Sequence, residues 1–102
     1  MVIEWLKFQV TPEAREQFIQ VDEQVWTAFL SKFEGFLGKE VWISPKSADE
    51  VILVIHWQTR EQWHAVPQAG LQESDREFAR QMAGVSYQIM EAGEYQVRKF
   101  PI

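Results

Sequence analysis

The stretch FEGFLGKEVWISPKSADEVILVIHWQTREQW, residues 33–63, contains two apolar runs separated by a short polar segment. Residues 36–44 and residues 51–57 combine β-branched and aromatic side chains, which is typical of strands. The polar segment PKSADE, residues 45–50, predicts a turn, so the two strands are expected to pair as a hairpin. Residues 51–57 are apolar on both faces, which favours a central strand that is covered on both sides.

A helix start follows this hairpin directly. The segment TREQ, residues 59–62, matches the capping-box pattern, in which a Thr at the N-cap is followed three residues later by Gln. Pro67 breaks or restarts this helix, because proline disfavours a helical conformation in the residue before it. A second helical piece is therefore expected over residues 67–82, and Gly84 ends it.

The segment before the hairpin predicts a strand and a helix. Residues 2–10 alternate between apolar and other side chains, and Glu4 interrupts one of the two faces. Thr11 is a suitable N-cap, and Pro12 fits the first helical position, where its missing N–H costs nothing. Helical spacing of apolar residues then continues until Gly35, which is expected to end the helix.

The last segment supplies another strand, with Gly93 as an expected bulge or kink. The predicted order is therefore β-α-β-β-α-β, a ferredoxin-like α+β fold with one antiparallel sheet and two helices on one face. The length of 102 residues predicts a single domain, 1–102. Trp5, Ile52 and Val54 would lie on the face without helices. A second copy related by two-fold symmetry would cover them, which predicts a homodimer.

Composition excludes several classes of site. The chain has no cysteine, so disulfides, thiolate metal sites and a Cys nucleophile are not available. Its net charge of -5 argues against nucleic-acid binding, which needs clustered Lys and Arg. No apolar run approaches the length of a membrane span, and the N-terminal segment lacks the basic start of a signal peptide. The expected compartment is therefore the cytoplasm, without a membrane partner.

The two histidines do not predict a metal site. His56 and His64 are eight residues apart across a strand–helix junction, not four apart on one helix. By strand alternation, His56 points toward the predicted dimer side, where a hydrogen-bonded interface histidine competes with a functional role. His64 is expected on an exposed helical face, and both histidines are candidate polar residues of the dimer interface or of a pocket.

The tryptophans Trp42, Trp57 and Trp63 are candidate pocket-lining residues, together with Val66 and Glu40. Trp57 is expected to face the helices, where it either lines a pocket or fills the core. Trp63 is expected to pack near the helix start. Trp42 shares a strand face with Glu40, and a carboxylate among aromatic rings is either a general base with a raised pKa or a solvated residue at a strand edge. Lys39 is expected to be solvated or paired across strands.

The stretch 33–63 resembles the central block of the antibiotic-biosynthesis-monooxygenase-like (ABM) dimeric α/β-barrel superfamily. With the segments VIEWLKF and YQVRKF, the whole chain is similar to a small cyanobacterial family within it. The resemblance implies a homodimer with a pocket between sheet and helices in each subunit, and no cofactor. Its members include cofactor-independent monooxygenases that act on electron-rich aromatic substrates, and haem-degrading enzymes. The positions that carry the resemblance are Gly35, Gly38, Asp49, Trp57, Thr59, Glu61 and Trp63.

The catalytic residues of the superfamily do not transfer. Many members carry a histidine in the helix after the Trp-x-Ser/Thr segment, at a position held here by Val66, and His64 stands two residues early. The haem-degrading branch uses an Asn, a Trp and a His. The Trp position also falls near Val66, the His position falls near Arg76, and the first strand has no Asn. This departure argues against haem degradation.

Two functions remain open at this point. One is a cofactor-independent monooxygenase that acts on a small aromatic or polyketide-like substrate. The other is a non-catalytic dimeric module that binds a small apolar ligand. The first relies on likeness of fold, which is a weak warrant for a reaction. The apolar Val66 in place of the histidine favours the second.

Overall fold

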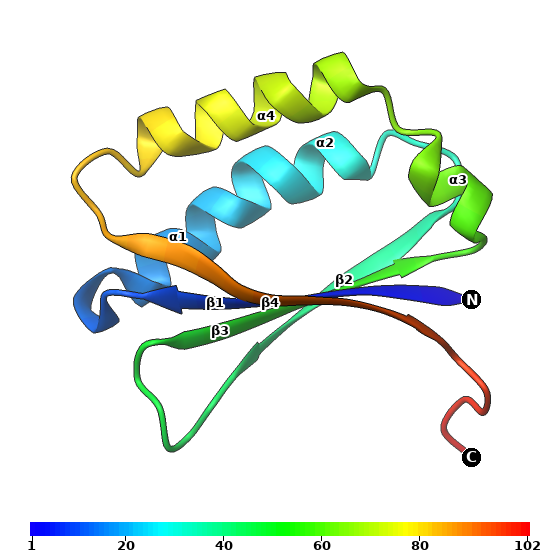
Figure 1. Ribbon diagram of the computed structural model, residues 1–102, viewed down its shortest axis with the longest axis horizontal. Coiled ribbons are helices and arrows are strands. Elements are labelled where there is room, and N and C mark those ends of the chain that lie inside the picture. Colours follow the sequence, from blue (N-terminus) through cyan, green and yellow to red (C-terminus); the bar gives the residue numbers. More distant parts are fainter.

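Four antiparallel strands form one sheet in the computed structural model, which describes residues 1–102. The strands are β1 (Val2–Val10), β2 (Phe36–Ile43), β3 (Glu50–Trp57) and β4 (Tyr87–Gln96), and their order in the sheet is β2-β3-β1-β4. The helices pack on a single face of the sheet, so the molecule has two layers (Figure 1). The predicted ferredoxin-like α+β fold is therefore confirmed.

The first helical segment is continuous but not regular. It runs through the 3-10 turn η1 (Pro12–Ala14), α1 (Arg15–Asp22), the π-helical turn η2 (Glu23–Thr27) and α2 (Ala28–Leu30). Thr11 does precede it, but its hydroxyl donates to the backbone oxygen of Ser86 at 3.3 Å and makes no capping bond. The predicted cap is therefore wrong in its bonding, because a tertiary contact takes the hydroxyl.

The second helical region follows the capping-box prediction more closely. Helix α3 (Arg60–His64) begins after Thr59, whose side chain accepts a hydrogen bond from the backbone N–H of Gln62 at 3.1 Å. Helix α4 (Gln68–Gln81) begins after Pro67, and Gly84 adopts a positive φ of 86° beyond its end. The proline thus separates two helices.

A bulge in β4 lies at a different residue from the one expected. The pairing with β1 jumps from Glu91 to Ile89, which leaves Met90 as the extra residue. Gly93 instead pairs in register with Trp5. A Cβ atom at Gly93 would come within 2.9 Å of the Tyr95 ring. This glycine therefore permits the close approach of an aromatic ring.

The core lies between the sheet and the helices. Phe18 of α1 packs edge-on against Phe78 of α4, with ring centroids 5.3 Å apart. Trp57 is fully buried at the other end of the core, where its ring lies edge-on to Phe36. Each buried aromatic side chain removes a large apolar area from water, so these contacts hold the two helical segments on the sheet.

The opposite face of the sheet carries no helix (Figure 1). Trp5 lies opposite Val54 and Trp42 lies opposite Ile52 in the strand register, so these four side chains share that face. Trp42 remains 46% exposed. An apolar surface of this kind on a small protein marks an interaction site more often than a free surface.

Candidate functional site

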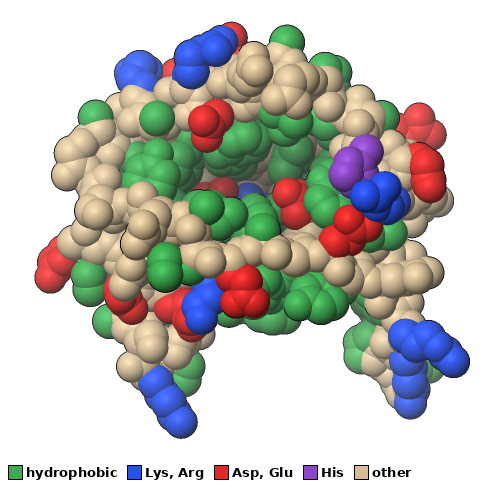
Figure 2. Space-filling view, viewed as in Figure 1, with side chains coloured by type: hydrophobic (Ala, Val, Ile, Leu, Met, Phe, Trp, Pro, Cys, Tyr) green, Lys and Arg blue, Asp and Glu red, His purple; other side chains and the backbone are tan.

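A cavity of about 350 Å³ lies between the sheet and the helices. Figure 2 shows it as a hollow whose walls are mostly hydrophobic side chains. Leu6, Leu53 and Ile55 line it from the sheet, and Trp26 and Leu71 line it from the helices. A mainly apolar cavity of this size fits a small organic molecule and is the usual form of a ligand site.

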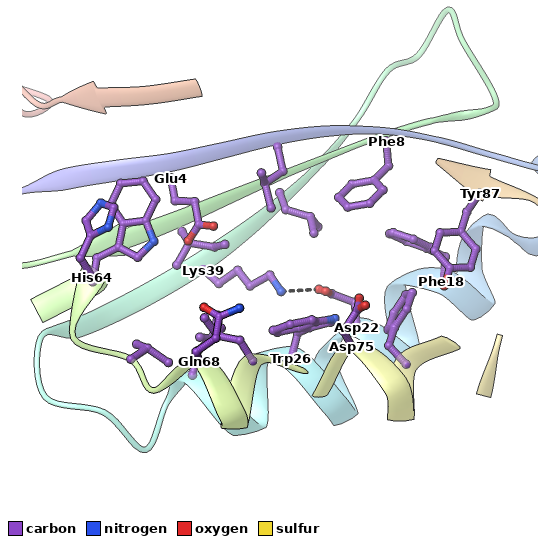
Figure 3. Close-up of a pocket in the computed structure, with 18 residues that line it drawn as sticks. Glu4, Phe8, Phe18, Asp22, Trp26, Lys39, His64, Gln68, Asp75 and Tyr87 are labelled. Atoms are coloured by element: carbon purple, nitrogen blue, oxygen red, sulfur yellow. Dashed lines mark ion pairs between the residues drawn. The ribbon is translucent and has the colours of Figure 1, made fainter. Parts of the chain in front are cut away.

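Three charged side chains from three different elements meet in this apolar cavity: Glu4 of β1, Asp22 of α1 and Lys39 of β2. The Nζ atom of Lys39 lies 2.5 Å from a carboxylate oxygen of Asp22, and both side chains are only 3% exposed. Figure 3 shows Lys39 extending from the sheet toward Asp22, with Glu4 on the same side of the cavity. The site therefore combines apolar walls with one buried ion pair and one further carboxyl group.

Strand register explains how Glu4 and Lys39 come together. Both residues pair with Ile55, Glu4 from β1 and Lys39 from β2. Residues paired across neighbouring strands point to the same face of a sheet. Glu4 and Lys39 therefore flank Ile55 on the face that the helices cover.

Asp22 reaches the cavity from the helix layer. It lies four residues after Phe18 and four before Trp26, so the three share one helical face, and all three line the cavity. Asp22 is also the last residue of α1 before the π-helical turn η2. Such turns occur frequently at functional sites, where they change the direction of nearby side chains.

Burial changes the acidity of both carboxyl groups. It raises the pKa of Asp22, and the charge and hydrogen bond of Lys39 oppose this effect. Burial also raises the pKa of Glu4, which the hydrogen bond from Trp57 and the charge of Lys39 oppose. The indole N–H of Trp57 lies 3.4 Å from Glu4 Oε1. Glu4 is therefore a stronger base than a solvated glutamate, and the contact with Trp57 orients its carboxyl group.

The rim of the cavity includes His64, Gln68 and Asp75, which Figure 3 labels beside the charged group. The ring of His64 lies against that of Trp63, with centroids 4.7 Å apart. His64 and Asp75 are exposed. The rim is thus more polar than the interior, which is consistent with an opening to solvent.

The structure places the predicted site residues in three different environments. Trp63, His64 and Val66 line the cavity. Trp57 does not line it; its ring is fully buried in the core, and its indole N–H alone reaches the site through Glu4. Trp57 is therefore a core residue that orients a cavity residue.

Trp42, Glu40 and His56 lie on the sheet face without helices, so the expectation that Trp42 and Glu40 line the pocket needs correction. Glu40 accepts hydrogen bonds from Trp42 Nε1 at 3.2 Å and pairs with His56 Nε2 at 2.6 Å. His56 Nδ1 also contacts the sulfur of Met1 at 3.3 Å. Glu40 lies on the face without helices because it pairs with Val54 in the strand register, and Val54 points away from the helices.

Lys39 and Asp22 were not among the expected site residues, and Lys39 is neither solvated nor paired with a neighbouring strand. The sequence did contain a signal for them. Asp22 interrupts an apolar helical stripe, and Glu4 interrupts an apolar strand face. Charged residues in such places are buried only when they are paired, so they predict a partner.

No group of three or more His, Cys, Asp and Glu side chains is arranged to hold a metal ion. No helix has both the length and the apolar character that crossing a membrane requires. The cavity and its charged group are thus the chemically distinctive part of the molecule.

Comparison with solved structures supports the fold along nearly the whole chain. SnoaB, a cofactor-independent oxygenase from Streptomyces nogalater, superimposes with a TM-score of 0.71 at 16% identity, covering 97% of this chain and 94% of SnoaB. A dimeric ferredoxin-like protein from an uncultured marine organism gives a TM-score of 0.66 at 15% identity, covering 100% and 99% of the two chains. At these identities the likeness shows the fold.

Among curated proteins, none matches the sequence. The family model described as antibiotic biosynthesis monooxygenase matches residues 1–70, which include β1, the first helical segment, the hairpin and α3. The matched part supplies Glu4, Asp22 and Lys39. Because this match covers more than half of the residues of the chain, the chain belongs to the antibiotic biosynthesis monooxygenase family.

Proposed function

We propose that the protein is a monooxygenase-like enzyme that oxidises a small aromatic or polyketide-like substrate without a cofactor. The observation that carries this proposal is the cavity of about 350 Å³, whose walls are mainly apolar but which contains a buried charged group. Apolar walls bind a flat aromatic molecule, and a few polar groups orient it. Family membership and the likeness to SnoaB support the reaction class.

The reaction needs no bound metal, because an electron-rich aromatic anion can itself transfer electrons to O₂. For an anthrone, the CH₂ group becomes a carbonyl. One oxygen atom of O₂ enters that carbonyl, and the other leaves as water with the two hydrogen atoms. The role of the protein is to bind the substrate, promote loss of its proton and exclude water.

Oxygen uptake tests this proposal. The purified protein is mixed with a panel of hydroquinones and anthrones, and O₂ consumption is followed beside a protein-free control. We expect faster uptake with at least one substrate, together with incorporation of ¹⁸O from labelled O₂ into the product. Uptake that the protein does not change for any member of the panel would contradict the proposal.

The second candidate is a non-catalytic module that binds a small apolar ligand in the same cavity. Val66, which is 7% exposed, lines the cavity at the position where many relatives carry a histidine, and this favours binding without turnover. Thermal shifts with an aromatic library, without O₂ uptake, are the expected result for this candidate. Haem titration provides a further comparison, and we expect no Soret shift because the Asn, Trp and His set is absent.

We further propose that the domain, residues 1–102, forms a homodimer through the sheet face without helices. Trp42 is 46% exposed there and Ile52 lies opposite it, so a second copy would remove apolar surface from water. A solved relative is described as dimeric. Light scattering should give twice the chain mass at micromolar concentration, and Trp42→Asp should give the monomer mass. A monomeric wild type would contradict the proposal.

A further inference from the structure

We propose that Glu4 and Lys39 form a proton-accepting and oxyanion-binding pair, so that the ligand is a neutral aromatic molecule with an acidic phenol or enol hydroxyl. Glu4 accepts the hydroxyl proton, and Lys39, held by Asp22, stabilises the oxygen anion that remains. This inference rests on the proposed function only in that an aromatic ligand occupies the cavity. It assigns the charged group a role that can be measured without turnover.

The position of the two groups supports this assignment. Glu4 and Lys39 flank Ile55 on the sheet wall of the cavity, and neighbouring strands lie ~4.8 Å apart. The charge of Lys39 acts on the Glu4 carboxyl group across this part of the cavity, so a hydroxyl bound between the two side chains would meet the carboxylate on one side and the ammonium on the other. Figure 3 shows Glu4 beside the sheet and Lys39 extending from the sheet across the cavity to Asp22.

The ion pair between Lys39 and Asp22 needs an explanation other than stability. Both side chains are 3% exposed, so both have lost nearly all contact with water. A buried ion pair of this kind is commonly no more stabilising than apolar side chains of the same volume. Its benefit is a fixed positive charge in surroundings that are shielded from water, where such a charge interacts with an anion more strongly than it does in bulk solvent.

Glu4 is suited to accept a proton. Its carboxyl group lines the cavity and is partly buried, and the indole N–H of Trp57 contacts Oε1 at 3.4 Å. That contact leaves the other carboxylate oxygen for the ligand. Burial raises the pKa of Glu4, which brings its basicity closer to that of an acidic phenol.

The charge balance selects the ligand class. Counted in their charged forms, Glu4, Asp22 and Lys39 carry a total of one negative charge, by summing -1, -1 and +1. An aromatic carboxylate from solution would add a second negative charge beside Glu4. A neutral phenol or enol adds none: its O–H bond breaks, the proton bonds to Glu4, and the electron pair stays on the oxygen beside Lys39. The cavity therefore favours hydroxyl compounds over carboxylates.

A nitrophenol tests the oxyanion site, because its ionised form is yellow and its neutral form is not. We expect binding to the wild type to lower the pKa of the probe by about 1 to 3, the effect of a nearby opposite charge, which means at least ~10-fold more phenolate. Lys39→Met should remove this change. The matched control is Lys7→Met, because Lys7 is also a strand lysine paired with a glutamate, Glu50, but lies on the other face; it should bind like the wild type.

Two variants protect this test from indirect effects. Lys39→Met leaves Asp22 without its partner, so the double variant Asp22→Asn with Lys39→Met provides a chain in which neither charge remains. It should also bind the probe without lowering its pKa. The other titratable side chains around the cavity are His64, Asp75 and Tyr87. His64→Gln removes the histidine at the rim, and a probe pKa that is no longer lowered in this variant would place the oxygen anion beside His64 and overturn the proposal.

Proton release tests the acceptor. In a weakly buffered solution, the wild type should produce yellow bound phenolate with little proton release, because Glu4 takes the proton. Glu4→Gln should release about one proton for each phenolate formed. Failure of the probe to bind, an unchanged probe pKa in the wild type, an equal change in Lys39→Met, or full proton release by the wild type would each overturn the proposal. A lowered probe pKa without O₂ uptake would contradict the oxygenase proposal alone.

Discussion

Lys39 and Glu40 are neighbours in β2, yet their side chains lie on opposite faces of the sheet. Lys39 enters the covered face, where it pairs with Asp22 in a setting that is almost closed to water. Glu40 enters the face without helices, where it pairs with His56 while its own side chain is 53% exposed. The two ion pairs are similar in distance, 2.5 Å and 2.6 Å, but very different in surroundings.

The surroundings decide what each pair can do. On the covered face, burial raises the pKa values of Asp22 and Glu4, so the carboxyl groups there resist ionisation. On the other face, hydrogen bonds from Trp42 and His56 lower the pKa of Glu40. Charged groups on the covered face are thus available for chemistry at a cost in stability, whereas Glu40 is a solvated partner of a partly buried histidine.

The largest effect on the free energy of unfolding is expected when the buried ion pair of Lys39 and Asp22 is broken. Asp22→Asn leaves the ammonium of Lys39 buried without its ion-pair partner, and the loss of one partner of a buried pair costs about 3–5 kcal/mol in the free energy of unfolding. Urea denaturation measures this change. Adding Lys39→Met in the same chain should restore most of the lost stability.

The matched control is Asp49→Asn. The carboxylate of Asp49 accepts a hydrogen bond from Gln9 at the surface, at 2.9 Å. Its loss should change the free energy of unfolding by no more than ~0.5–1 kcal/mol. Equal effects of Asp22→Asn and Asp49→Asn would remove the distinction between a buried and an exposed charge.

Local patterns in the sequence were sufficient for most of the fold. Strand alternation, the polar segment 45–50, the capping box at Thr59 and Pro67 are local signals, and each corresponds to an observed element boundary. The bulge at Met90 was not predictable, because it depends on the register in which β4 pairs with β1. The π-helical turn η2 was missed for a similar reason, since nothing in the spacing of its residues marks it.

The site was less accessible from sequence. Residues 36–43 have apolar side chains on both faces, so alternation alone does not say whether Lys39 or Glu40 faces the helices. That choice is made by pairing with β3, a contact between distant residues. Lys39 also finds its partner Asp22 in another element, 17 positions earlier in the sequence (39 − 22). Trp63, Val66 and His64 could be placed near the cavity because the resemblance to a family supplied their surroundings.

A smaller effect on the free energy of unfolding is expected at Glu4. The sign of its dependence on pH is opposite to that of most buried glutamates in ion pairs. The folded pKa of Glu4 is raised above its ordinary value of 4.5, so the folded state binds more protons between these two values. The free energy of unfolding therefore falls as pH rises through this interval, and the loss persists at neutral pH. Glu4→Gln removes this loss and keeps an acceptor for Trp57.

We expect Glu4→Gln to be more stable than the wild type at neutral pH, by ~1.4 kcal/mol for each unit by which burial raises the pKa. Thermal or urea unfolding over a pH series measures this difference, which should vanish as pH falls below 4.5. A variant less stable than the wild type at neutral pH would show that the charge of Glu4 stabilises the fold and would contradict its assignment as a desolvated base.

The smallest effect is expected at Glu40, with the opposite dependence on pH. Because the hydrogen bonds from Trp42 and His56 lower its folded pKa, its contribution is present above the unfolded value of 4.5 and is lost as pH falls through the folded pKa. In the single chain, Glu40→Gln should therefore be less stable at neutral pH, but by under ~1 kcal/mol, since an exposed pair is screened by solvent. The difference should disappear in strongly acidic solution.

Unfolding of Glu40→Gln is compared with that of the wild type at equal protein concentration, because association stabilises the folded state by mass action. Glu34→Gln is the control, since Glu34 is exposed in the turn before β2, and its free energy of unfolding at neutral pH should match that of the wild type. A loss above ~2 kcal/mol for Glu40→Gln would place its pair with His56 in a buried setting. Water would then be excluded from the charged side chains on the face without helices, as it is on the covered face, because a second copy covers them.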